Sequence, residues 1–182
     1  KEVVNDLQSN AAAGGGRGKK RAVTYALIPP TLKAEFVALK QSKKITFNEI
    51  DTRFLMELKR LSHDNLSAFL GVSFNEVGTF YFMNSLVERA SLEDFIRDED
   101  FNFDDTFKSA FMRDICKGIA YLHKSQVGYH GLLNLGTCLI DANWVLKLTQ
   151  FGITTLVSTM MREHVVEVLP PTRNGPTFNA GK

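Results

Sequence analysis

The stretch that decides the fold runs from His130 to Gly152 and reads HGLLNLGTCLIDANWVLKLTQFG. Two short apolar runs, at positions 138–141 and 144–149, lie on either side of a tight turn at positions 142–143. Apolar runs separated by two turn residues are typical of a β-hairpin. The stretch therefore predicts a loop, then a hairpin, then a Phe-Gly pair.

This order of loop, hairpin and Phe-Gly pair resembles the active site of protein kinases, where the loop reads H-R-D-L-x-x-x-N and the pair is D-F-G. The residues that would perform the chemistry differ. Leu132 stands at the catalytic Asp position, Thr137 at the metal-binding Asn position, and Gln150 at the D-F-G Asp position. Leu132 cannot accept the proton of a substrate hydroxyl, and the neutral Thr137 and Gln150 hold a divalent metal poorly. We therefore expect no catalytic residue, no metal site and no phosphoryl transfer.

The residues before this loop predict an antiparallel sheet with one helix. Alternating or continuous apolar runs bounded by turn residues indicate the strands, and a helical spacing of apolar residues indicates the helix. The strands are expected at positions 23–28, 36–40, 66–74 and 78–83, and the helix at positions 50–61 with a stripe that starts at Ile50.

The second strand ends in Val-Ala-Leu-Lys, with the lysine at position 40. This run matches the V-A-I-K strand whose lysine touches nucleotide phosphates in kinases, although an exposed lysine at a strand end is the simpler alternative. Glu57 lies at the edge of the apolar stripe of the helix, and a buried carboxylate needs a cationic partner. We therefore expect an ion pair between Lys40 and Glu57, unless Glu57 reaches solvent.

A polar connector follows the fourth strand at positions 84–90. In a kinase such a connector is the hinge between the two lobes, its backbone amides face an adenine, and its first position is the gatekeeper. ATP is the expected cofactor, bound weakly and with little dependence on magnesium. The candidate nucleotide site comprises Ala38, Lys40, Glu57, Asn84, Leu86 and Val87.

A four-residue ladder of apolar side chains from Phe107 to Leu122 predicts a long amphipathic helix that ends near Lys124. His130 is expected to be a structural core histidine rather than a base or a ligand, because no nucleophile or metal cluster accompanies it. After Gly152 the pattern is mixed and specifies no element, so residues 156–182 are interpreted as a truncated activation-segment region and tail.

The composition is that of an ordinary globular domain, with 182 residues, 44% hydrophobic residues and a net charge of +2. Residues 1–21 are basic and rich in glycine, which predicts a disordered linker, or alternatively a patch for an anionic surface or a nucleic acid. No partner nucleic acid is expected. No signal peptide or long apolar run is present, so the chain is expected to be soluble and cytosolic. It begins with Lys1 and is expected to be part of something larger.

Beyond the kinase motifs, the sequence resembles the kinase-homology domain of receptor-type guanylyl cyclases, and most of all the nematode branch. The resemblance covers roughly residues 36–155. It is carried by His130-Gly131 in place of His-Arg, by Cys138, by the WVLKLT run at positions 144–149, and by FLMELK at 54–59 followed by HDNL at 63–66.

The chain also departs from that family. The family usually reads H-G-x-L-K-x-x-N-C and D-[FY]-G, whereas this chain has Asn134 for the Lys, Thr137 for the Asn and Gln150 for the Asp. These departures weaken the case for nucleotide chemistry further.

The resemblance implies an α+β, protein-kinase-like fold with an antiparallel-sheet N-lobe at residues 22–85 and an incomplete helical C-lobe at residues 86–155. It implies a catalytically dead regulatory module on the cytosolic side of the plasma membrane, between a membrane span and a cyclase domain. The module would transmit the ligand or ATP state to cyclic GMP synthesis, with the cyclase domain as its partner and a homodimer in the parent receptor. The alternatives are a residual ATP-binding kinase-like enzyme and a non-functional receptor fragment.

Overall fold

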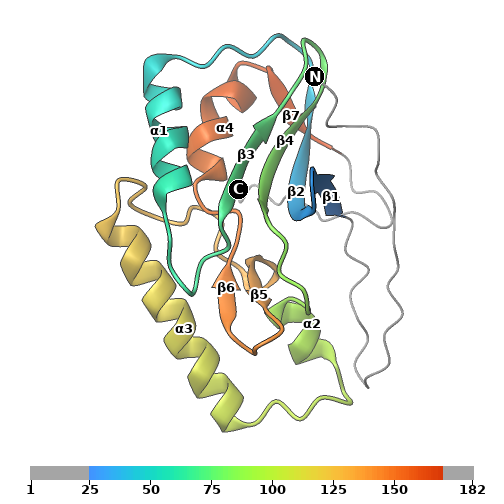
Figure 1. Cartoon of the computed structure of the whole chain (residues 1–182), viewed down its shortest axis with the longest axis vertical. Helices are drawn as coiled ribbons and strands as arrows, with labels where there is room; N and C mark the ends of the chain where they lie inside the picture. The colour runs from blue at the N-terminus through green and yellow to red at the C-terminus, as the bar shows by residue number, and fades with distance from the viewer. Residues whose placement is uncertain (1–24, 170–182) are drawn as a thin grey trace.

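The computed structural model describes residues 25–169 of the chain. It has a sheet with two helices beside it in the upper part of Figure 1, and a long helix with a small hairpin in the lower part. The elements in chain order are β1 (Tyr25–Ile28), β2 (Leu32–Gln41), α1 (Glu49–Arg60), β3 (Phe69–Ser73), β4 (Gly78–Ser85), α2 (Leu92–Arg97), α3 (Asp105–Lys124), a 3₁₀ turn η1 (Leu135–Thr137), β5 (Cys138–Ile140), β6 (Leu146–Leu148), α4 (Ile153–Arg162) and β7 (Val166–Val168).

The larger sheet has the strand order β1-β2-β4-β3, and every neighbouring pair is antiparallel. The predicted α+β fold, with an antiparallel sheet and one helix between its strands, is confirmed. The predicted strand at 36–40 lies in the second half of the ten-residue β2. The start of the first predicted strand, the basic linker at 1–21 and the end of the predicted tail lie outside the described residues.

The two faces of β2 differ in burial. Leu39 and Gln41 are almost fully buried, whereas Lys40 between them is exposed. Successive side chains of a strand point to opposite faces of the sheet, so β2 has one inner face and one outer face. The inner face continues onto β4, where Phe80 lies opposite Leu39 and Phe82 lies opposite Val37. These apolar side chains form the upper part of the core.

Helix α1 begins at a capping box made by Asn48 and Asp51, in which each side chain accepts a hydrogen bond from the other residue's backbone amide. The predicted helix at 50–61 is confirmed within a residue at each end. Its predicted apolar stripe is wrong at Ile50, which is 77% exposed, while Leu58 is fully buried. Ile50 lies in the first turn of the helix.

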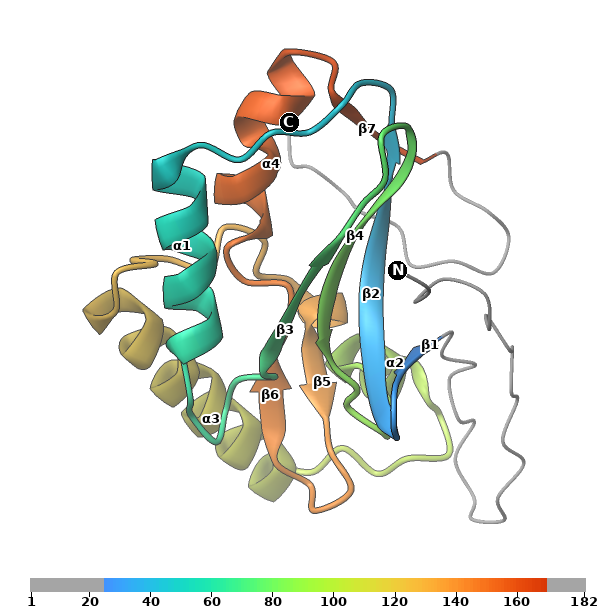
Figure 2. The same ribbon diagram turned by 45° about the horizontal axis from the view of Figure 1, so that its top comes forward.

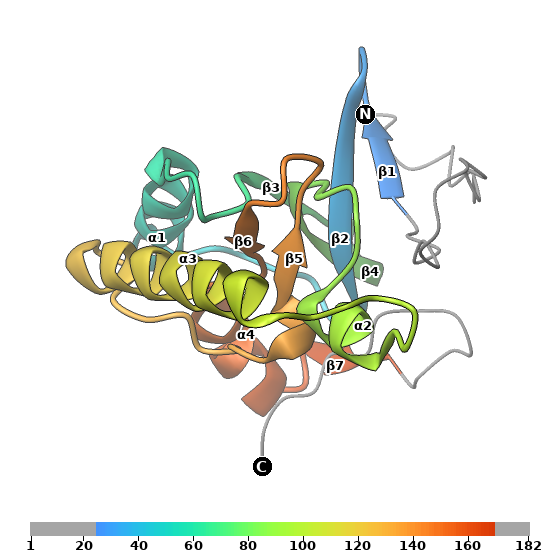
Figure 3. The ribbon, with the colours of Figure 1, turned by 90° about the horizontal axis from the view of Figure 1, so that it is seen from below.

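The lower part is α3 and the predicted hairpin, now seen as β5 and β6. Seen from below, α3 runs in front of this hairpin (Figure 3). The side chains of Phe111 and Leu122 are buried, and Leu146 N donates a hydrogen bond of 3.0 Å to the Asp114 carboxylate. The predicted long helix is confirmed, and its apolar ladder is directed at the hairpin.

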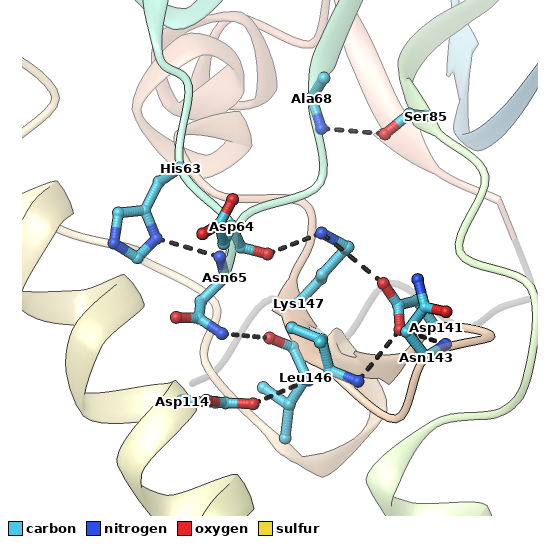
Figure 4. Close-up of polar contacts among 11 residues, drawn as sticks. His63, Asp64, Asn65, Ala68, Ser85, Asp114, Asp141, Asn143, Leu146 and Lys147 are labelled. Atoms are coloured by element: carbon cyan, nitrogen blue, oxygen red, sulfur yellow. Dashed lines mark hydrogen bonds and ion pairs between the residues drawn. The ribbon is translucent and has the colours of Figure 1, made fainter.

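The segment between α1 and β3 holds the hairpin in place (Figure 4). Asn65 is buried, its side-chain amide donates to the Leu146 carbonyl at 3.0 Å, and its own carbonyl accepts from Leu148 N at 2.9 Å. Lys147 Nζ donates to the Asp64 carbonyl at 2.6 Å. The HDNL motif at positions 63–66 therefore joins the upper part of the structure to the lower part.

After Gly152 the structure has two elements that the sequence analysis does not predict, α4 and β7. Ile153, Leu156, Val157 and Met160 recur at the spacing of one helical face, and all four are buried. β7 then pairs with the end of β2, with Lys40 opposite Glu167. In Figures 1 and 2, α4 lies between α1 and the sheet.

Candidate functional site

The loop that precedes β5 is closed on itself by hydrogen bonds. The Asn134 side chain accepts from Gly136 N at 2.8 Å and from Thr137 N at 3.1 Å. The Thr137 hydroxyl accepts from Asn134 N at 3.0 Å and lies 3.1 Å from the Leu132 carbonyl oxygen, to which it can donate. Thr137 is only 3% exposed. Its hydroxyl therefore maintains the shape of the loop, at the position where a kinase places a metal ligand.

The other two degenerate positions lie beside Thr137. Leu132 is half-buried and packs against the core. Thr149 N donates to the Thr137 carbonyl at 3.0 Å, which places Gln150, the next residue, at the end of the same loop. Gln150 has a left-handed backbone, with φ of 61°, and is half-buried. The structure thus brings together the three positions that the sequence identifies as degenerate.

His130 is confirmed as a buried structural residue, 3% exposed. Its Nδ1 accepts a hydrogen bond from Leu132 N at 3.2 Å, and its ring meets the edge of Phe151 at 6.3 Å between centroids. Its carbonyl accepts from Gly152 N at 3.2 Å. Burial lowers the pKa of His130 to about 4, so the ring is neutral at pH 7 and joins the loop to the Phe-Gly pair.

The expected ion pair between Lys40 and Glu57 is wrong for this structure. Lys40 Nζ lies 3.3 Å from the Glu167 carboxylate, and Glu57 lies 2.8 Å from Arg60 of its own helix. The physical reason is the period of a strand. Because Leu39 and Gln41 point into the core, Lys40 must point to the outer face, away from the face that the core fills.

The remaining residues of the candidate nucleotide site lie on both faces of the sheet. Ala38 is half-buried and shares the outer face with Lys40, whereas Asn84 is buried on the inner face, opposite Glu35. The structure therefore does not bring Ala38 and Asn84 together. The nucleotide site stays a prediction.

The connector after β4 is hydrogen-bonded to its neighbours. Leu86 N donates to the Lys33 carbonyl at 3.1 Å, and Val87 is buried. Further along, Arg89 N donates to the Ile140 carbonyl at 3.1 Å. The Leu86 amide, which the kinase resemblance directs at an adenine, is thus engaged within the chain.

An antiparallel sheet with one helix, followed by a connector, a long helix and a hairpin between a His-Gly loop and a Phe-Gly pair, defines a protein-kinase-like domain. Residues 15–171 match the family model described as protein tyrosine and serine/threonine kinase. Among curated relatives, the chain is 46% identical over 170 residues to the receptor-type guanylate cyclase gcy-10 of Caenorhabditis elegans, which covers 92% of this chain and 16% of the relative.

Two further relatives have the same description. The identity is 51% over 135 residues with gcy-27 of Caenorhabditis elegans, covering 74% of this chain and 18% of the relative. It is 32% over 139 residues with Gyc76C of Drosophila melanogaster, covering 75% and 9%. The chain therefore belongs to the protein kinase family, as a kinase-homology domain of the receptor guanylyl cyclase type. It spans less than a fifth of the length of these relatives.

Two further features of residues 25–169 bear on membrane spanning and metal binding. None of the helices in that range is both long enough and apolar enough to cross a membrane. In the same range, no group of three or more His, Cys, Asp or Glu side chains is arranged to hold a metal ion.

The pairing of Lys40 is tested by double-mutant cycles. For Lys40→Met with Glu167→Gln, we expect a coupling free energy below about 1 kcal/mol, because the side chains are 58% and 44% exposed and solvent screens them. For Lys40→Met with Glu57→Gln, we expect additive changes. The measurement is urea unfolding at low and high salt. A coupling of several kcal/mol between positions 40 and 57 would contradict the structure.

The burial of His130 predicts a pH dependence of stability. Between pH 6.5 and about 4 the unfolded chain takes up a proton at this ring and the folded chain does not, so stability falls as the pH falls through that window. The loss should reach about 3 kcal/mol at the acid end. His130→Gln should remove this part of the pH dependence in urea titrations. The control is His123→Gln, at an exposed position of α3, which should leave it intact.

Proposed function

We propose that this chain is a catalytically inactive, kinase-like regulatory module. The observation that carries the proposal is the closed loop around Thr137. At the three positions where a kinase places its base and its metal ligands, this chain has an aliphatic side chain, a hydroxyl engaged in the loop, and a neutral amide. The interpretation as a residual kinase has no comparable observation in its favour.

We propose further that the module works within a receptor guanylyl cyclase, where it transmits the state of the receptor to a cyclase domain in a homodimer. Support comes from the relatives, which are named as receptor-type guanylate cyclases and extend far beyond the matched region. Support also comes from the links between the upper and lower parts, through Asn65 and Lys147, since such links let a change at one part reach the other.

The first test is an assay of γ-phosphate transfer to the chain itself and to generic substrates, with magnesium or manganese. We expect no transfer, because Leu132 cannot act as a base and Thr137 and Gln150 hold metal poorly. The control is Lys40→Met. Activity that this variant abolishes would contradict the proposal, and activity that survives it would come from a contaminant.

The second test uses the full-length receptor that contains this segment. Thr137→Val removes the hydroxyl that closes the loop, so we expect ligand-stimulated cyclic GMP synthesis to fall while unstimulated synthesis with manganese stays unchanged. Ser109→Ala, at an exposed position of α3, is the matched control and should behave as wild type. Equal stimulation in both variants would show that the loop has no part in transmission.

A further inference from the structure

We propose that α4 joins the upper and lower parts of the module from within, so that the module needs no bound nucleotide to hold them together. The module is then closed by its own chain and needs no ATP to close. This inference goes beyond the proposed regulatory function, because a module without kinase activity could still require nucleotide.

The first contact is with the lower part, at Gly131. This glycine has φ of +81°, and a Cβ atom at this position would collide with the Thr154 hydroxyl in the first turn of α4. Next to it, the Thr155 hydroxyl lies 3.1 Å from the Tyr129 hydroxyl. Gly131 stands where a kinase has an arginine. Because it has no side chain, α4 can pack directly on the loop.

The second contact is with the upper part, at Gly152 and along α4. A Cβ atom on Gly152 would lie 2.8 Å from Leu58 and 3.2 Å from Phe54, so α4 begins directly against α1. The buried side chains of α4 belong to the same core cluster as Leu39 and Phe80 of the inner sheet face. α4 therefore belongs to the core that the inner face of the sheet bounds.

The third observation concerns the groups that a kinase uses to hold ATP. Lys40 points to the outer face and is paired with Glu167 of β7, the strand that follows α4. The Leu86 amide donates to the Lys33 carbonyl. Both groups are engaged within the chain, and the segment from α4 to β7 supplies the partner of one of them.

The test is hydrogen exchange of the whole chain by mass spectrometry, with a matched pair of glycine variants. Gly131→Ala introduces both the backbone strain and the collision with Thr154. Gly128→Ala introduces the strain alone, since Gly128 has φ of +77° and nothing within 4 Å of its added Cβ. We expect peptides of α4 and β7 to exchange at least about tenfold faster in Gly131→Ala than in Gly128→Ala.

Thr154→Ala provides the rescue, because it removes the hydroxyl with which the new Cβ collides. The double variant with Gly131→Ala should return the exchange of α4 and β7 to the rate seen in Gly128→Ala. Equal exchange in the two glycine variants, or no rescue by Thr154→Ala, would show that α4 does not depend on the space at Gly131 and would overturn the proposal.

A second arm tests the role of nucleotide. ATP, with or without magnesium, should change neither the melting temperature of the wild-type chain nor the exchange of α4. A saturable rise in melting temperature that Lys40→Met abolishes would overturn the proposal. Neither arm depends on phosphoryl transfer. If the exchange or nucleotide results contradict the role of α4, the proposal of an inactive module still stands. If the transfer assay shows activity, the role of α4 is still decided by the exchange and nucleotide results.

Discussion

The burial of α4 between α1 and the sheet is the interaction on which the rest of the structure depends. Its four core side chains are each at most 8% exposed. At about 1.5–3 kcal/mol for each fully buried side chain, they contribute about 6–12 kcal/mol as an upper estimate. This is comparable to the whole stability of a typical domain, about 5–15 kcal/mol. Exposed ion pairs such as Lys40 with Glu167 contribute far less, so packing decides where α4 and β7 lie.

That packing also explains what happens at the degenerate loop. With α4 docked on Gly131, the loop has the Thr154 hydroxyl on one side and the hairpin on the other. Hydrogen bonds within the loop, between Asn134 and Thr137, then satisfy the polar groups of the buried Thr137. A carboxylate at Leu132 would have to be desolvated there, which is costly.

Much of the fold could be predicted from the sequence, because its signals are local and periodic. The hairpin turn, the ladder of α3 and the alternation of the strands each specify one structure, and the order of motifs indicates the kinase family. The face of Lys40 could not be predicted. The run around it is apolar on both sides, so burial of the residues at 37 and 39 or of those at 36 and 38 is equally compatible with the sequence.

The candidate site could be predicted only in part. The positions of Leu132, Thr137 and Gln150 follow from motif spacing, but the contacts of the Thr137 hydroxyl depend on a loop conformation that no spacing specifies. The helical spacing of α4 is present in the sequence at Ile153 and Leu156. This spacing is hard to recognise because threonines and methionines interrupt it, and because the kinase motifs that indicate the fold end at Gly152.

The proposal tested most directly is that the direction of Lys40, and not only three substituted side chains, prevents phosphoryl transfer. The most direct measurement restores the kinase residues together, as Leu132→Asp with Thr137→Asn and Gln150→Asp, and assays γ-phosphate transfer with magnesium. We predict no transfer above the background of the same variant with Lys40→Met, because Lys40 still points to the outer face and is still paired with Glu167. Magnesium-dependent transfer that requires Lys40 would contradict this account.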